Sequence, residues 1–290
     1  MHDILKNYYN IDISIDEPGY FHYLGSLYYI EHVKNFQQFL TIYQLYRYTM
    51  HSLHIQAYKI VPNVHQNMIS QSYVLCVYQS SAVDFYQYLH IILQPVRISP
   101  IPIKNIKEQW IEKIDCCREC AKNYAYSFKH DQDILSLIYY YCGVGENSVN
   151  ILNHILSLQQ DATIPLSLAL NHPIQNYMYE LLNPFYYTIS SRSREIIHLL
   201  QSQLIDLSQI KMILESEYFD IFEMIYLFAR TLYPSTFFQQ LLSSQLDNQS
   251  VQKYYSLLEQ EKLLYSKMRD LLSIYVTLPK INWINEENMV

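Results

Sequence analysis

Glycine is scarce in this sequence, at 4 of 290 residues, whereas 30 residues are tyrosine. Because glycine lets backbone amides approach a phosphate group closely, this scarcity argues against a glycine-rich phosphate-binding loop. Charged residues are also few, at 16%, and the acidic ones are in excess, which gives a net charge of −7. This balance argues against nucleic acid and anionic lipid as partners.

Long apolar runs and paired cysteine motifs are missing as well. No run approaches the roughly 20 residues of a membrane span, and the N-terminal MHDILKNYYNID has no basic region followed by an apolar stretch. We therefore expect cytoplasmic synthesis and reduced cysteines, which number five. The spacing Cys117-x-x-Cys120 has no second pair to complete a zinc site, so no metal is expected. Cys116 and Cys120 share a helical face, where we expect a small apolar contact.

Half of the residues are apolar, so the chain can bury a sizeable core. Its length fits one two-lobed domain or two small domains. The tyrosine excess is compatible with a codon bias of the genome, and it also suits wet protein interfaces, because a phenol packs like an apolar ring and keeps a hydroxyl for hydrogen bonds.

The pattern of residues changes near position 80. Residues 20–25 and 26–33 predict two strands joined at Gly25-Ser26, residues 36–51 a helix, and 55–61 and 72–78 two more strands. Residues 1–79 therefore predict a ββαββ N-lobe, and residues 80–290 a helical C-lobe. In the C-lobe, helices are expected over 83–93, 104–128, 133–141, 146–158, 193–202, 207–214, 218–232, 234–242 and 251–276, with a short strand near 164–170.

Two polar residues are given structural roles from their positions. Gly143-Val144-Gly145 is expected to break the helical pattern, with Asn147 as the N-cap of the next helix. Arg230 lies in an apolar helix, where we expect it to pair with a carboxylate or a carbonyl group.

The lobe order is typical of kinase-like folds, and several segments resemble spore-coat kinase-like proteins of the CotS and YutH type. Residues 140–149 (YYCGVGENSV) resemble the P-Y-Y-L-G-L-A-E-N-A-I segment of that family. Ser193-Arg194-Glu195-Ile196 resembles its S-R-D-I segment, residues 227–234 (LFARTLYP) its R-L-L-F-P stretch, and residues 279–283 (PKINW) its tail. The resemblance implies an α+β, two-lobed protein-kinase-like fold, similar to aminoglycoside and choline phosphotransferases, in a protein of the endospore coat.

Phosphoryl transfer on such a scaffold requires a strand lysine that pairs with a helix glutamate. The strand expected to carry the lysine reads Leu27-Tyr28-Tyr29-Ile30-Glu31-His32, and it contains no lysine or arginine. The following helix, 36–50, contains no Asp or Glu. The sequence therefore lacks this clamp.

The catalytic loop and the magnesium position also depart from the kinase pattern. The segment Leu168-Ala169-Leu170-Asn171-His172-Pro173-Ile174 keeps the histidine of a His-x-Asp motif, but Ile174 stands in place of the carboxylate. Ser190 is assigned to the magnesium position, where a neutral hydroxyl replaces an acid. We expect His172, Ile174 and Ser190 to be degenerate positions, with no catalytic residue, cofactor or metal.

The sequence thus predicts a non-catalytic pseudokinase that is a component or assembly factor of the spore coat. It would be made in the mother cell and deposited in the coat, where it binds other coat proteins. Two alternatives remain open: an atypical small-molecule phosphotransferase that uses ATP and a displaced acidic residue, and a pseudokinase that binds a nucleotide or metabolite without reacting.

Overall fold

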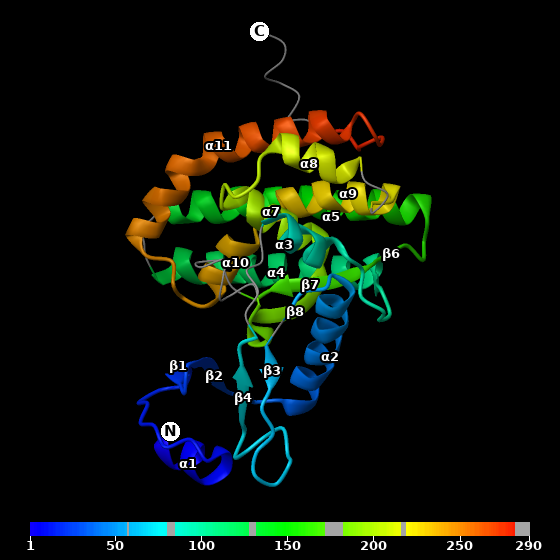
Figure 1. The fold of residues 1–290 in the computed structure, drawn as a ribbon. Coiled ribbons are helices and arrows are strands. Elements are labelled where there is room, and N and C mark those ends of the chain that lie inside the picture. The colour runs from blue at the N-terminus through cyan, green and yellow to red at the C-terminus, as the bar shows by residue number, and fades with distance from the viewer. Residues whose placement is uncertain (57, 80–84, 128–131, 172–181, 216–218, 282–290) are drawn as a thin grey trace. The chain divides into compact units, whose positions relative to one another are not determined.

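A computed structural model of the chain describes all residues except 57, 80–84, 128–131, 172–181, 216–218 and 282–290 (Figure 1). The chain forms two compact units. The N-terminal unit comprises Met1–Ile98 and Leu166–Arg192, and the helical unit comprises Ser99–Pro165 and Ser193–Val290. The predicted lobe boundary after residue 79 stays a prediction, because the N-terminal unit is not the predicted N-lobe: it runs to Ile98 and also includes Leu166–Arg192.

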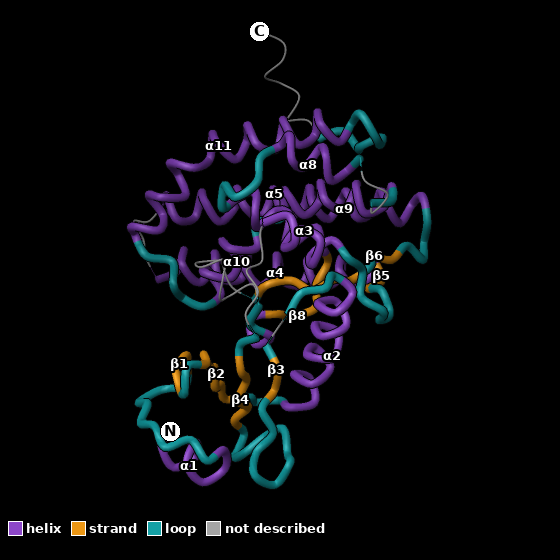
Figure 2. The backbone as a smooth tube through the Cα atoms, viewed as in Figure 1, coloured by secondary structure: helices purple, strands orange, loops and turns teal. Residues whose placement is uncertain are grey.

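The N-terminal unit is built on a four-stranded antiparallel sheet in the order β1-β2-β4-β3 (Figure 2). The turn between β1 and β2 places Leu24 and Gly25 at φ 48° and 77°, the conformation that a tight hairpin requires. The two predicted strand pairs and the helix between them are confirmed to within a few residues, except that β3 is much shorter than expected. The bounds are β1 Gly19–Tyr23, β2 Ser26–His32, α2 Phe36–Ser52, β3 Lys59–Ile60 and β4 Tyr73–Val77.

A helix that the sequence did not predict, α1 (His2–Tyr9), supports one face of this sheet. Its buried residues Leu5 and Tyr9 join Phe21, Ile30 and Leu75 in one apolar cluster. The alternation of side chains along β1 and β2 allows this arrangement, because one face of each strand is available for burial.

The N-terminal unit also contains α3 (Phe85–Leu93), β7 (Leu166–Leu170), the short 3₁₀ helix η1 (Pro184–Tyr186) and β8 (Tyr187–Ser191). Strands β7 and β8 pair antiparallel, with Leu170 opposite Tyr187. Buried Arg192 follows β8 directly, and its Nη1 donates a hydrogen bond of 2.9 Å to the carbonyl oxygen of Leu93, at the end of α3. This contact fixes the β7–β8 pair against the helix.

The helical unit consists mainly of long helices that pack on one another. Helices α4 and α5 pack together, and α5 also contacts α9 and α11, as Figure 1 shows. In the described part of the chain, no helix is both long and apolar enough to cross a membrane. The bounds are α4 Ile103–Ser127, α5 Gln132–Leu158, α7 Arg192–Gln201, α8 Leu207–Leu214, α9 Ile221–Leu232, α10 Ser235–Leu242 and α11 Asn248–Leu272, with the short strands β5 Ile101–Pro102 and β6 Thr163–Ile164.

The helix break predicted at Gly143-Val144-Gly145 was wrong, because α5 runs through it without interruption. A Cβ atom added at Gly145 would lie 3.1 Å from side-chain atoms of Ile114 and Phe238, so this glycine allows close helix packing. Asn147 is not an N-cap either. Its Nδ2 donates to the carbonyl oxygen of Gly143 at 3.1 Å within the same helix.

Candidate functional site

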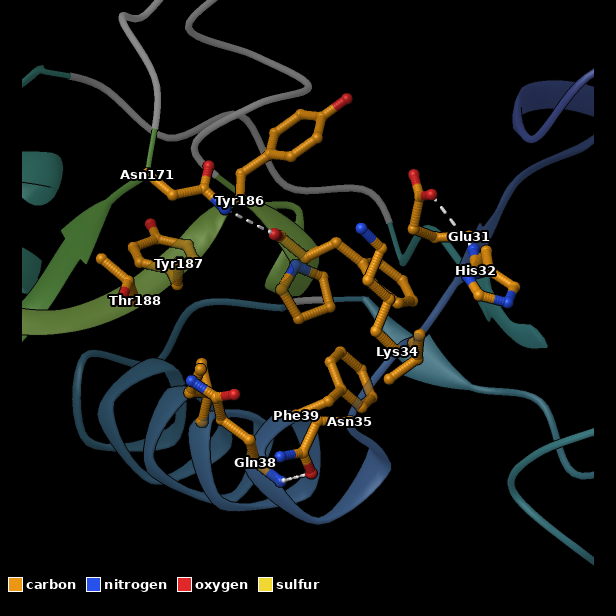
Figure 3. A pocket seen from close by; sticks show the side chains of 14 residues that line it. Glu31, His32, Lys34, Asn35, Gln38, Phe39, Asn171, Tyr186, Tyr187 and Thr188 are labelled. Atoms are coloured by element: carbon orange, nitrogen blue, oxygen red, sulfur yellow. Dashed lines mark hydrogen bonds between the residues drawn. The ribbon is translucent and has the colours of Figure 1, made fainter. Parts of the chain in front are cut away.

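A pocket of about 760 Å³ lies within the N-terminal unit, between the end of β2, the start of α2 and the segment from η1 into β8. We call it the polar pocket. Figure 3 shows Asn35 and Gln38 on one side of it, Asn171 and Tyr186 on another, and Glu31 and His32 on a third. Its remaining lining residues are Val33, Lys34, Phe39, Ile42, Pro184, Phe185, Tyr187 and Thr188.

Local hydrogen bonds hold the segments around the polar pocket. The side chain of Asn35 accepts a hydrogen bond from the backbone N–H of Gln38 at 3.1 Å and so caps α2. Asn171 donates from its backbone to the carbonyl oxygen of Tyr186 at 2.8 Å and from Nδ2 to that of Phe185 at 3.1 Å. The residue that follows β7 is thereby tied to η1.

Aromatic rings from β1, β2, α2 and η1 pack together at this pocket. The ring of Tyr29, on β2, lies 5.4 Å from that of Phe185 and 5.8 Å from that of Tyr186, centroid to centroid. Tyr20 lies 4.5 Å from Tyr29, and Phe39 of α2 stacks on Phe185 at 4.7 Å. We call these five residues the aromatic cluster. Such ring pairs stabilise by about 0.5–1.5 kcal/mol each beyond the area that they bury.

Buried Asn183 connects the aromatic cluster to the backbone. Its Nδ2 donates to the hydroxyl oxygen of Tyr20 at 2.9 Å, while its Oδ1 accepts from the backbone N–H of Phe185 at 3.1 Å. This one amide therefore joins β1 to the start of η1.

Tyr29 is the residue of β2 whose ring meets Phe185 and Tyr186 of η1. It is 5% exposed, and its hydroxyl donates to Oε2 of Glu31 at 2.6 Å. Burial, and then the hydrogen bond to Glu31, raise the pKa of Tyr29 far above its usual value, so the phenol stays neutral. A neutral ring on β2 therefore faces η1.

The charges around the polar pocket are sparse. Among its described lining residues, Lys34 is the one lysine and Glu31 the one carboxylate. Glu31 already accepts hydrogen bonds from Tyr29 and, at 3.1 Å, from the backbone N–H of His32. The pocket thus offers amide, hydroxyl and imidazole groups to a ligand, but no pair of carboxylates to hold magnesium against a triphosphate.

The predicted site residues are only partly described. His172 and Ile174 lie outside the described residues. Ser190 lies on β8 opposite Ser167, three positions along the ladder from the Leu170–Tyr187 pair that adjoins Asn171. The role given to Ser190 stays a prediction, and the register brings Tyr186 nearer than Ser190 to Asn171.

The cysteines on α4 were examined by sequence as possible metal ligands. In the described part of the chain, no three His, Cys, Asp or Glu side chains are grouped so that they could hold a metal ion. Cys116 is exposed, and it lines one hollow together with Cys120, Ile111 and Leu242, so the two cysteines share a helical face as predicted. Their small apolar contact stays a prediction. Cys117 is the buried residue, and burial raises the pKa of its thiol to about 12.

Comparisons with known proteins identify the fold. No family model and no curated protein matches the sequence. Similar solved structures include an aminoglycoside phosphotransferase from Alicyclobacillus acidocaldarius, at a TM-score of 0.62 and 10% identity over 91% of this chain and 93% of that one. A spectinomycin phosphotransferase solved with ADP and spectinomycin has a TM-score of 0.45 and 13% identity, over 89% of this chain and 93% of that one.

The first of these similarities confirms the predicted fold class. The chain has the two-lobed α+β, kinase-like fold seen in that aminoglycoside phosphotransferase. At such low identity the likeness concerns the fold alone, because one fold supports many activities. The closer relation to spore-coat proteins stays a prediction.

Sequence reasoning missed the aromatic cluster and Asn183. The only local signal was the density of rings in residues 20–29 and 185–187. Nothing in that density indicates that Tyr29 meets Phe185, or that Tyr20 meets Asn183, because these partners lie far apart in the chain.

Proposed function

We propose that this chain is a pseudokinase, a kinase-like protein without phosphotransferase activity, and that it acts in the bacterial endospore coat by binding other coat proteins. The observation that carries the first part is Tyr29. It is a buried neutral phenol on the strand position that faces η1, with its hydroxyl held by Glu31. The second part extends the resemblance of residues 140–149 and 193–196 to coat proteins.

The chemistry of phosphoryl transfer supports a loss of activity. Catalysis of this kind rests almost entirely on positioned charge, supplied by a lysine and by magnesium held on carboxylates. Here β2 supplies a phenol, α2 has no acidic residue, and the one lining carboxylate of the polar pocket is engaged by Tyr29. Each of these differences removes a charge that a phosphotransferase needs.

Exposed tyrosines support a role in protein binding. Tyr48, Tyr86 and Tyr139 are 52%, 69% and 56% exposed, and the guanidinium of Arg97 lies 5.2 Å from the ring centre of Tyr48. Tyrosine and arginine are enriched among the residues that carry the binding energy of protein interfaces. These side chains are therefore suitable anchors for a partner.

Thermal unfolding with ATP tests the loss of nucleotide chemistry. We expect the same Tm with and without ATP, in the presence or absence of magnesium, because a ligand raises Tm only when it binds the folded state. A rise in Tm that requires magnesium, together with turnover of ATP, would instead support the phosphotransferase. A rise that is independent of magnesium would support a nucleotide-binding pseudokinase.

A fluorescent fusion expressed from the promoter of its own gene tests where in the cell the protein acts. We expect the signal to appear during sporulation and to form a ring around the forespore. Diffuse fluorescence in growing cells, with no ring later, would contradict the coat assignment and leave the question of catalysis untouched. A fusion that carries Tyr48→Ala and Tyr86→Ala should lose part of the ring if these anchors bind coat proteins.

A further inference from the structure

A second pocket, of about 440 Å³, lies in the helical unit between α4 and the turn that joins α9 to α10. We call it the arginine pocket. Trp110 and Tyr233 form its wall, with ring centroids 4.0 Å apart and planes 12° from parallel. Gln109, Lys113 and Ser235 bring polar groups to it, together with Arg230.

Arg230 is stacked on rings instead of being paired with a carboxylate or carbonyl, so its predicted partner was wrong. The guanidinium carbon lies 5.9 Å from the ring centre of Trp110 and 5.7 Å from that of Tyr233. Among the described residues, no carboxylate or carbonyl oxygen accepts a hydrogen bond from Arg230 or forms an ion pair with it. The cation therefore lies against aromatic faces, and no described residue accepts a hydrogen bond from it.

The electrostatics around Arg230 favour an anion. Desolvation lowers the pKa of its guanidinium, and the nearby cation Arg194 lowers it further. Lys113, which lines the same pocket, is exposed and forms no ion pair with a described residue. Three cations thus lie at or near one hollow, and only Glu112 opposes them in its lining. A desolvated cation without a counterion is unfavourable, and a bound anion relieves that cost.

The start of α10 adds neutral donors at the same place. Its N-cap is Pro234, which provides no side-chain hydrogen bond to the first turn, and Ser235 lines the pocket. The N-terminus of a helix attracts anions through its unpaired N–H groups. Tyr233 is 4% exposed, and its hydroxyl has no hydrogen-bond partner among the described residues. A buried phenol without a partner is an independent sign that a polar ligand is accommodated nearby.

We propose that the arginine pocket binds the phosphate group of a small ligand, with Arg230 and Lys113 as the cations that hold it and the start of α10 as a further donor. An arginine fork and a helix N-terminus together match the oxygens of a phosphate group. The site belongs to the helical unit alone and does not depend on the proposed function of the polar pocket.

Tryptophan fluorescence reports binding directly. The chain has two tryptophans, Trp110 and Trp283. A Trp283→Phe chain therefore leaves Trp110, in the wall of the pocket, as the only indole. We expect inorganic phosphate and phenyl phosphate to change its emission in a saturable way, while sodium chloride at equal ionic strength does not. Tighter binding of phenyl phosphate would indicate that the phosphate group is carried on an aromatic ligand, and equal binding would indicate the free ion.

Charge variants locate the site. In the Trp283→Phe background, Lys113→Gln should weaken phosphate binding roughly tenfold, as expected for loss of one charge-assisted contact. Glu112→Gln should strengthen binding, because it removes the opposing carboxylate. Lys104→Gln is the matched control, since it removes an exposed lysine from the same helix outside the pocket. Arg230→Gln should abolish binding, and circular dichroism shows whether that variant folds.

Three results would overturn the proposal. The first is the absence of saturable binding of either phosphate probe. The second is an equal loss of affinity in Lys104→Gln and Lys113→Gln. The third is unchanged affinity in Glu112→Gln and Lys113→Gln, which are surface variants that are expected to fold even if Arg230→Gln does not.

Discussion

The polar pocket and the arginine pocket are both lined by aromatic rings, but they differ in whether their charged side chains have partners. In the polar pocket the rings surround a neutral phenol, and the carboxylate of Glu31 is already bound by Tyr29. In the arginine pocket the rings support the cation Arg230, which has no described counterion. The described lining of the polar pocket thus holds one carboxylate that is already hydrogen-bonded, whereas the arginine pocket holds a cation that has no described counterion.

This difference indicates that aromatic residues serve two purposes in the chain. Between β2 and η1 they join segments that are far apart in the sequence. On α4 and after α9 they hold a cation in place by facing it with their π-electrons. The comparison would fail if the aromatic cluster proved unimportant for stability, or if the helix packing behind the arginine pocket proved loose.

The largest effect is expected at the aromatic cluster. Tyr29→Ala removes a ring that is 5% exposed and that contacts Tyr20, Phe185 and Tyr186. Loss of a buried aromatic side chain lowers the free energy of unfolding by about 3–5 kcal/mol. Urea unfolding followed by circular dichroism measures this loss of unfolding free energy.

Tyr29→Phe is the matched control for that experiment. It keeps the ring and removes only the hydroxyl that donates to Glu31. The loss should be about 1.5–3 kcal/mol, the range for a hydrogen bond to a charged group. If both variants lost the same free energy, the hydrogen bond and not the ring packing would be what holds this region.

A smaller effect is expected at the glycines of α5. Gly145 lies against Ile114 of α4 and Phe238 of α10, the two helices that supply Trp110 and Ser235 to the arginine pocket. Gly145→Ala should therefore lower the free energy of unfolding by about 1–3 kcal/mol through overpacking. It should also change the fluorescence of Trp110.

Gly143 provides the contrast, because a Cβ atom added there meets nothing within 4 Å. Gly143→Ala should raise the free energy of unfolding by about 0.5–1 kcal/mol, since alanine is the better helix former. Equal changes in the two variants, measured by thermal unfolding, would show that α4 and α10 do not press on α5 at Gly145.

The same glycines show where sequence reasoning succeeds and fails. The hairpin at Gly25 was predictable because a positive φ is a local demand. The run Gly143-Val144-Gly145 carries the same local signal for a turn, but packing against Ile114 and Phe238 overrides it. Local propensity is a weak prior whenever tertiary contacts decide.

The candidate site also has features that the sequence predicts and features that it does not. The absence of lysine from residues 27–33 and of acids from 36–50 could be read directly, because it needs only the position of β2 and α2. The sequence does not indicate which side chains pack beside β2 and α2 in the folded protein. The contact of Tyr29 with Phe185 joins segments that are distant in the chain, and no local pattern specifies such a pair.

The smallest effect concerns a second carboxylate that is held by tyrosine, this time in the helical unit. Glu261 of α11 accepts a hydrogen bond from the hydroxyl of Tyr141 at 2.9 Å and one from that of Tyr265 at 3.5 Å. Desolvation raises the pKa of Glu261, and the two hydrogen bonds only partly oppose that shift. Burial, and then the nearby charge of Glu261, raise the pKa values of Tyr140 and Tyr254 to about 12, so both phenols stay neutral at ordinary pH.

The sign of the pH dependence follows from this raised pKa. Above the ordinary pKa of glutamate the unfolded chain releases this proton first, so the folded state loses stability as the pH rises toward the folded pKa of Glu261. Glu261→Gln keeps an acceptor for Tyr141 and removes the desolvated charge. It should therefore raise the free energy of unfolding at pH 7 by about 0.5–1 kcal/mol and change it little at pH 4. Thermal unfolding at both pH values measures this, with Glu259→Gln, an exposed neighbour paired with Lys262, as the control. Stabilisation by Glu261→Gln that is equal at the two pH values would mean that packing, and not the buried charge, is responsible.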